Sequence, residues 1–219
     1  ASIKPENISN ITVNQLSAFE SQITSFKPEQ IASLNPEIIP KLLTSQITAF
    51  SQDQITVLTT AEIFSLIPSQ IISIKQNQLS VLKFIQIAAF NPNVISEFTY
   101  NQIETFTIDQ IKSFTINQIF NLTTYQINFI KTNQISELLS SQVSGFNSII
   151  IQALNSIQIM SFTSTQINAL TSIQIPHIKT TQIIILTTDQ IISLNPNIIE
   201  ILSSEQIIIL KTFQIIAFT

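Results

Sequence analysis

The side chains that could carry out chemistry are few and scattered in this sequence. His177 is the only histidine, cysteine is absent, and the thirteen carboxylates stand mostly alone, as at Asp53 and Asp109. Metal sites need clustered His, Cys, Asp or Glu, nucleophilic triads need a base beside the nucleophile, and glycosidases need paired carboxylates. The single glycine, Gly145, offers no glycine-rich phosphate loop. We therefore predict a protein that is not an enzyme, with no cofactor and no metal, and a packing or solvated role for His177.

One polar residue does recur at a fixed spacing, and it is glutamine. Octads follow one another every eight residues from Gln22 to Gln214, which makes 25, and twenty of them carry this glutamine. A branched aliphatic residue follows it directly, and a Leu, Phe or Ile follows three residues later. The glutamine column could form a ligand-binding ladder or serve the structure alone, and we favour the structural role. Because one octad cannot bury its own apolar side chains, the octads must stack into a solenoid.

The positions inside an octad indicate a short capped helix. With glutamine at position 4, the apolar positions 5 and 8 are one helical turn apart, but eight residues of a continuous helix turn through about 800°, so the helix must break in every octad. Position 1 is most often Ser, Thr or Asn, which with Gln or Glu three residues later forms a capping box. The pairs predicted to form such boxes include Thr59 with Glu62, Thr107 with Gln110, and Thr187 with Gln190.

Two further signals concern where each helix starts. Proline recurs at position 2, the first helical position, where a missing N–H costs nothing. These prolines are Pro28, Pro36, Pro68, Pro92 and Pro196. Where Lys or Leu occupies position 1 and Thr or Ser follows, as at Lys131 and Thr132, we expect the cap to slide by one residue.

The predicted fold is an all-α solenoid of very short capped helices, one for each octad. The alternative is a β-solenoid, because Ile, Thr and Phe favour strands and a glutamine column could form an amide ladder. Spacing by three is not strand alternation, however, and a single glycine would leave many β-turns without their usual residue.

The domain organisation follows from the register of the repeat. Residues 1–19 are predicted to be an N-terminal capping segment, and residues 20–219 the solenoid. Above the octad there is a seven-octad block that starts near residues 35, 91 and 147, where Asn opens the octad and Ile38, Val94 and Ile150 replace glutamine. This block is either a trace of gene duplication or a whole number of superhelical turns.

Charge and hydropathy limit the partners. The formal net charge is −4, and the nine cationic residues are scattered lysines, so no basic stripe exists and nucleic acid is not an expected partner. Apolar runs such as residues 183–186 are far shorter than the roughly 20 residues that span a bilayer, so no membrane insertion is expected.

Two apolar surfaces are predicted to serve self-assembly into a homo-oligomer or filament. In the last five octads, positions 6 and 7 turn apolar, which predicts a lateral strip that includes Ile184, Ile192 and Ile208. An uncapped solenoid end exposes its core, so either the chain continues beyond it or another molecule docks there, and docking predicts a head-to-tail contact of the last layer with the first. The residues predicted for this contact are Phe213, Ile215 and Phe218 in the last layer and Phe19, Ile23 and Phe26 in the first.

The best-formed octads are residues 58–66, L-T-T-A-E-I-F-S-L, and residues 186–194, L-T-T-D-Q-I-I-S-L. They resemble the L-T-T-x-Q-[IV]-x-x-L octads of long bacterial surface and secreted adhesin-like proteins, over nearly the whole chain. The chain departs from them in using Ile, Phe and Asn where those repeats favour Ala and Val. The resemblance implies an extracellular or cell-surface structural protein of a filament or appendage. The alternative is an adhesin-like module that binds a protein or glycan partner. The family has no catalytic residues to carry over.

Overall fold

The structure is a computed structural model that describes residues 4–19, 22–194, 198 and 200–217. Over these residues the chain forms short α- and 3-10 helices and no strand. The predicted all-α solenoid of short helices is therefore confirmed, and the β-solenoid alternative is wrong. The chain divides into two compact units, Ala1–Ser113 and Phe114–Thr219, and each is described by itself.

Nearly every octad contributes one helix. The helices of the first unit are α1 (Pro5–Ile8), α2 (Val13–Ser17), η1 (Ile23–Ser25), α3 (Pro28–Ile31), η2 (Pro36–Lys41), α4 (Thr44–Ala49), α5 (Gln52–Thr56), α6 (Thr60–Phe64), α7 (Pro68–Ser73), α8 (Gln76–Leu79), α9 (Phe84–Ala89), η3 (Pro92–Glu97), α10 (Tyr100–Thr105) and α11 (Ile108–Lys112). Those of the second unit are α12 (Ile116–Phe120), α13 (Thr124–Ile127), α14 (Thr132–Ile135), α15 (Ser140–Ser144), α16 (Ser148–Ala153), α17 (Ser156–Met160), α18 (Ser164–Asn168), η4 (Ile175–His177), α19 (Thr180–Ile183), α20 (Thr188–Ile192), α21 (Ser204–Ile208) and α22 (Thr212–Ile216).

The helices end without any left-handed residue. Between α10 and α11, Phe106 (φ −58°, ψ 134°) and Thr107 (φ −73°, ψ 166°) leave the helical region together and then the next turn begins. No described residue, glycine included, has a positive φ. Because an extended link of ordinary residues ends each turn, the repeat does not need the glycine that usually ends a helix.

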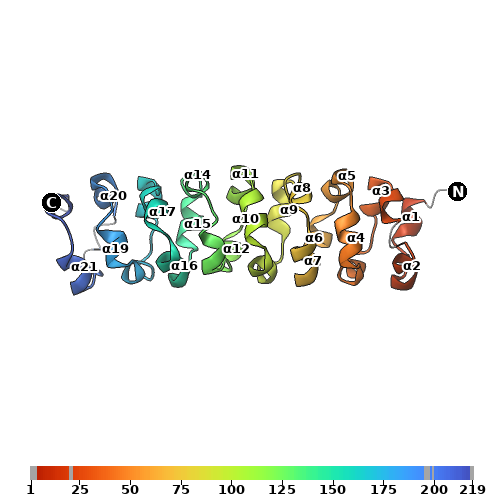
Figure 1. The fold of residues 1–219 in the computed structure, drawn as a ribbon, viewed down its shortest axis with the longest axis horizontal. Coiled ribbons are helices and arrows are strands. Elements are labelled where there is room, and N and C mark those ends of the chain that lie inside the picture. The colour runs from red at the N-terminus through yellow and green to blue at the C-terminus, as the bar shows by residue number, and fades with distance from the viewer. Residues whose placement is uncertain (1–3, 20–21, 195–197, 199, 218–219) are drawn as a thin grey trace. The chain divides into compact units, whose positions relative to one another are not determined.

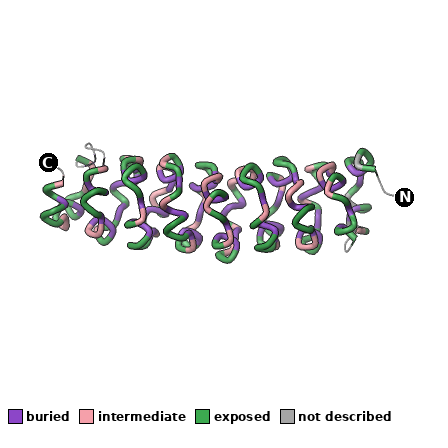
Figure 2. Tube along the Cα trace, turned by 90° about the horizontal axis from the view of Figure 1, so that it is seen from above, coloured by how far each residue is buried: buried purple, intermediate pink, exposed green. Residues whose placement is uncertain are grey.

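Positions 4, 5 and 8 of the octad face the interior. In the octad of α11, Gln110, Ile111 and Phe114 are 4%, 0% and 3% exposed. The buried parts of the chain follow the inside of each unit, and the exposed turns lie outside (Figure 2). The buried column at positions 5 and 8 matches the sequence prediction, and the buried glutamine adds a polar position to the core.

Each helix packs against the helix three octads away. In the first unit α3 contacts α5, and α5 contacts α8, and these three helices follow one another along one edge (Figure 1). The same step joins α12 to α15 and α15 to α18 in the second unit. Glutamine side chains instead reach back four octads, as Gln54 does to Ile23. A superhelical turn therefore holds between three and four octads, so two turns hold six to eight, a range that includes the seven-octad block.

Two octads that open on Asn-Pro, those of η2 and η3, form 3-10 helices. Asn35 Oδ1 accepts a hydrogen bond from Glu37 N at 3.0 Å, and Asn91 Oδ1 accepts from Asn93 N at 3.0 Å, which tightens the first turn of η2 and η3. Asn147 precedes serine instead of proline and accepts from the N–H three residues later, and α16 is an α-helix. In all three octads the aliphatic residue that replaces glutamine is buried.

The expected slide of the cap at Lys and Leu positions is wrong. At Leu43, Lys131 and Lys179 the N-cap stays at position 1, and its backbone N–H donates to the glutamine Oε1 of the same octad at 2.7 to 2.9 Å. This half of the capping box uses only the backbone of position 1, so it does not depend on the side chain there. The buried positions 5 and 8 fix the register instead.

Residues 4–19, expected to be a capping segment, contain two short helices, of which α2 follows the design of the repeats and α1 has no side-chain cap. Thr12 and Gln15 make a capping box at the start of α2, and Ile8 and Leu16 are buried. Because α1 packs against α3, this segment lies against the first octads of the solenoid.

Candidate functional site

The glutamine at position 4 is the most regular polar feature of the interior. Gln110 Oε1 accepts from Thr107 N at 3.0 Å, while Thr107 Oγ1 accepts from Gln110 N at 3.2 Å. The Gln110 Nε2 group donates to the carbonyl oxygens of Leu79 and Leu82, both at 2.9 Å. One side chain therefore starts its own helix and also ties it to the octad four steps earlier.

The same double contact recurs along both units. The Nε2 atoms donate to the carbonyl oxygens 28 and 31 residues earlier, at 2.6 to 3.0 Å, from Gln54, Gln70, Gln78, Gln86, Gln102, Gln110, Gln158, Gln166, Gln174, Gln182, Gln190, Gln206 and Gln214. Both N–H groups and the oxygen of these amides are engaged within the protein. The glutamine column is therefore a structural feature whose polar atoms are not directed at a ligand.

The link between octads was missed by the sequence reasoning, although the sequence carries a signal for it. A capping box accepts Glu as well as Gln, because only a side-chain oxygen is needed. This chain nevertheless has glutamine in twenty octads and glutamate in one, at Glu62. That preference indicates that the amide N–H groups are used, since a carboxylate cannot supply them.

The three predicted capping pairs lie where the sequence places them. Thr187 and Gln190 repeat the geometry of Thr107 and Gln110, with bonds of 3.1 and 3.2 Å. Glu62 Oε2 accepts from Thr59 N at 2.6 Å and from Thr59 Oγ1 at 2.8 Å. The second oxygen of Glu62 has no hydrogen-bond partner, and it is the one such buried side-chain polar atom among the described residues.

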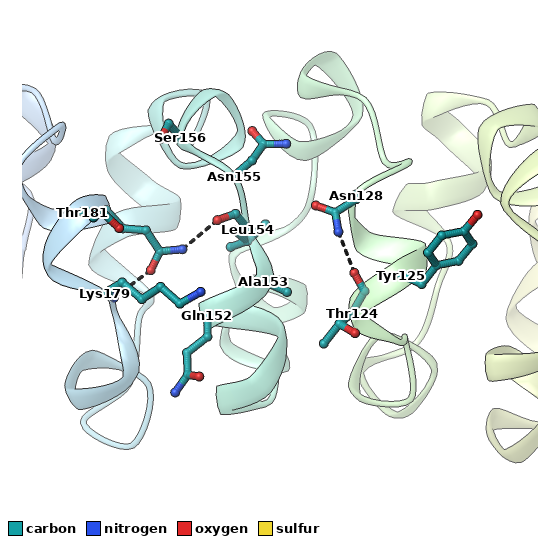
Figure 3. Close-up of a pocket in the computed structure, with 11 residues that line it drawn as sticks. Thr124, Tyr125, Asn128, Gln152, Ala153, Leu154, Asn155, Ser156, Lys179 and Thr181 are labelled. Carbon is teal, nitrogen blue, oxygen red and sulfur yellow. Dashed lines mark hydrogen bonds between the residues drawn. The ribbon is translucent and has the colours of Figure 1, made fainter.

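Outside the core, shallow polar grooves lie between neighbouring octads. A groove of about 500 Å³ in the second unit is lined by residues of octads 123, 147, 155 and 179, numbered by their first residue (Figure 3). Its polar lining includes Gln152, Asn155, Lys179 and Thr181. A groove of about 480 Å³ in the first unit is lined at the same octad positions by Ile72, Lys75, Thr99 and Asn101. The grooves therefore follow from the stacking, and their chemistry varies with the residues that line them.

His177 lies near the first groove but has an ordinary surface contact. Its Nδ1 atom is 3.2 Å from Gln152 Nε2, which comes from the helix three octads earlier. Pro176, at position 6, cannot donate the backbone bond that an α-helical turn uses there, and this octad has the short 3-10 helix η4.

The residues predicted for assembly are mostly exposed in the last octads and are buried or half-buried in the first layer. Ile192, Ile208, Phe213 and Ile215 are exposed by 60%, 81%, 43% and 52%, and Ile184 is half-buried. In the first layer Ile23 and Phe26 are buried and Phe19 is half-buried with its ring 5.2 Å from that of Phe26, so this layer is not an open face. Phe218 lies outside the described residues.

Within the described part of the chain, no three His, Cys, Asp or Glu side chains gather in a group that could hold a metal ion. None of the helices described there is long and apolar enough to cross a membrane. No protein-family model matches the sequence, and no curated protein is significantly similar to it.

Proposed function

We propose that this chain is a structural repeat protein that belongs to an extracellular filament or surface appendage and assembles end to end through its octads. The proposal assigns no catalytic activity to the chain. The extracellular location rests on the resemblance of the octads to those of bacterial surface proteins. The assembly rests on the side chains of the last octads.

The proposal of end-to-end assembly rests mainly on the exposure of core positions in α21 and α22. Position 5 is at most 3% exposed in the described interior octads, yet Ile207 and Ile215 at this position are 46% and 52% exposed. A further octad stacked on this layer, whether from a continuation of the chain or from another molecule, would bury them, and each buried aliphatic side chain contributes about 1.5–3 kcal/mol. The incoming glutamines would also be placed to bond backbone carbonyls of this layer, as they do within the units.

The occupant that we propose is the first layer of a second copy. Because Ile23 and Phe26 are already buried, docking would involve α1 and α2, which either join the contact or move aside. Helix α2 has the capping box of the octads, and Ile8 of α1 and Leu16 of α2 are buried like the core residues of the octads, so these helices already pack against the first octads.

The test is light scattering of this chain and a variant with Ile207→Lys and Ile215→Lys. We expect concentration-dependent multimers for the wild type and a monomer for this variant. A matched control with Ile157→Lys and Ile173→Lys changes residues that are 70% and 75% exposed at interior octads, and it should assemble normally. Equal assembly of all three proteins would contradict the end-to-end contact, and loss of assembly with Ile192→Lys and Ile208→Lys instead would indicate a lateral one.

The alternative is an adhesin-like module, and the recurring polar grooves favour it. Each unit has at least one such groove with its own lining, and such a groove could recognise a protein or glycan. A wild-type chain that stays monomeric and binds immobilised glycans, with binding lost on Thr181→Ala and Lys179→Ala, would support this function over the structural one. These substitutions change groove residues whose side chains are not part of the buried core.

A further inference from the structure

Glu62 is a buried carboxyl at a place where the rest of the column has an amide. Its side chain is 0% exposed. Oε2 is engaged by the N–H and the hydroxyl of Thr59, but Oε1 is buried without a hydrogen-bond partner. A buried unsatisfied oxygen costs free energy, and a buried charge without a partner costs much more.

The neighbouring octads indicate what Oε1 faces. One octad earlier, Gln54 Nε2 donates to the carbonyls of Ile23 and Phe26, and one octad later, Gln70 Nε2 donates to those of Ile39 and Leu42. By the same offsets of 31 and 28 residues, the equivalent carbonyls for Glu62 belong to Ile31 and Leu34. A carboxylate has no hydrogen to donate to these oxygens and is repelled by them, whereas a protonated carboxyl can donate one O–H.

Among the described residues, no charged group forms an ion pair with Glu62. The titratable side chains on or directly before α9, η2, α3 and α5, and on the octad four steps ahead, are Lys83, Glu37, Lys41, Lys27, Glu29, Asp53 and Glu97. All are exposed except Glu97, which is half-buried, and within the described residues none forms an ion pair with Glu62. Burial raises the pKa of Glu62 above its ordinary value, and the two hydrogen bonds from Thr59 only partly oppose that rise.

We propose that Glu62 is protonated in the folded protein and that its O–H takes the place of the amide N–H, donating to the carbonyl oxygen of Ile31 or Leu34. When the pH rises, the proton passes to the solvent and the carboxylate faces those oxygens. The link from Glu62 to the octad that contains α3 is then lost, so Glu62 acts as a pH-sensitive contact inside the first unit.

The direction of the pH dependence follows from linkage. A carboxyl with a raised pKa in the folded state holds its proton longer there than in the unfolded chain, so its stabilising contribution is fully present below the unfolded pKa. That contribution is lost as the pH rises through the folded pKa. Between the two values the unfolding equilibrium constant rises by up to about tenfold for each pH unit.

The experiment uses the full chain with carbon-13 label in its glutamate side chains, followed by NMR from about pH 4 to about pH 8. One carboxyl carbon, identified by its absence in Glu62→Gln, should titrate above all the others. Urea unfolding over the same range should show a fall in stability with pH that Glu62→Gln removes. The matched control Glu29→Gln, at an exposed carboxyl of the same unit, should leave the fall unchanged.

A second variant tests the mechanism at another octad. Gln78 donates to Ile47 and Phe50 at 2.9 Å, so Gln78→Glu should introduce a second late-titrating carboxyl and steepen the loss of stability. A Glu62 carbon that titrates with the other glutamates, or an unaltered pH dependence in Glu62→Gln, would overturn the proposal. If Glu62→Gln does not fold, an ordinary titration of the new carboxyl in Gln78→Glu would overturn it equally.

Discussion

The double role of the glutamine column can be measured with Gln110→Met, which keeps the shape of the side chain and removes its polar atoms. The substitution deletes the bond from Thr107 N and the two bonds to Leu79 and Leu82. Thr107→Ala, in contrast, deletes only the other half of the capping box. Comparing the two variants separates the cap from the link between octads.

The expected loss of stability depends on which other hydrogen bonds remain for each group that was bonded to Gln110. The carbonyl of Leu82 lies in a link between helices and receives its bond from Gln110, so losing that bond costs about 1–3 kcal/mol as a buried unsatisfied group. The carbonyl of Leu79 keeps a bond from Leu82 N, and Thr107 is exposed to water, so each of these losses costs about 0.5–1.5 kcal/mol. The sum is about 2–6 kcal/mol, against about 1 kcal/mol for Thr107→Ala.

The assay is urea unfolding followed by far-UV circular dichroism, with both variants compared in the same buffer. Gln76→Met is the matched control, because Gln76 is an exposed glutamine that also donates to a carbonyl, that of Asn101, at 3.0 Å. It should change the free energy of unfolding by no more than about 0.5 kcal/mol. If Gln110→Met is no more destabilising than Thr107→Ala, the bonds to Leu79 and Leu82 contribute nothing and the reasoning is refuted.

Two further predictions concern the core and the caps. Ile111→Ala should lower the free energy of unfolding by about 2–5 kcal/mol, because Ile111 is 0% exposed. The control Ile173→Ala, at a residue that is 75% exposed, should have little effect. Equal effects of the two substitutions would show that the inward face is misassigned. Lys75→Thr should raise the free energy of unfolding by about 0.5–2 kcal/mol, because it adds a side-chain oxygen to a helix start that has only the glutamine half of its capping box. A thermal unfolding experiment that shows no rise in the melting temperature would contradict this prediction.

The proline and threonine positions could be interpreted from local physics alone. Pro68 is the first residue of α7, where its missing N–H would have no helical partner, and Thr99 caps α10 with the bonds expected of its type. The same local reasoning failed at Lys131, because the position of the helix start is set by the buried residues of the whole stack and not by the best available cap. The exposed strip at the last octads was also predicted only in outline. Position 6 is exposed at Ile192 and Ile208, while position 7 is half-buried at Ile185.

The sequence by itself determined the period, the inward positions 5 and 8, and the starts of those helices that open on Ser, Thr or Asn, because these depend on spacing and on bonds within one octad. Only the tertiary structure decided that octads meet three and four steps apart, since the path of the chain between turns depends on packing that no single octad contains. It also revealed the hydrogen bonds from the glutamine Nε2 atoms to carbonyl oxygens four octads earlier, and the oxygen of Glu62 that has no hydrogen-bond partner. The glutamine bonds involve residues such as Leu79, which lies about thirty positions before Gln110 and becomes its neighbour only when the solenoid closes a turn.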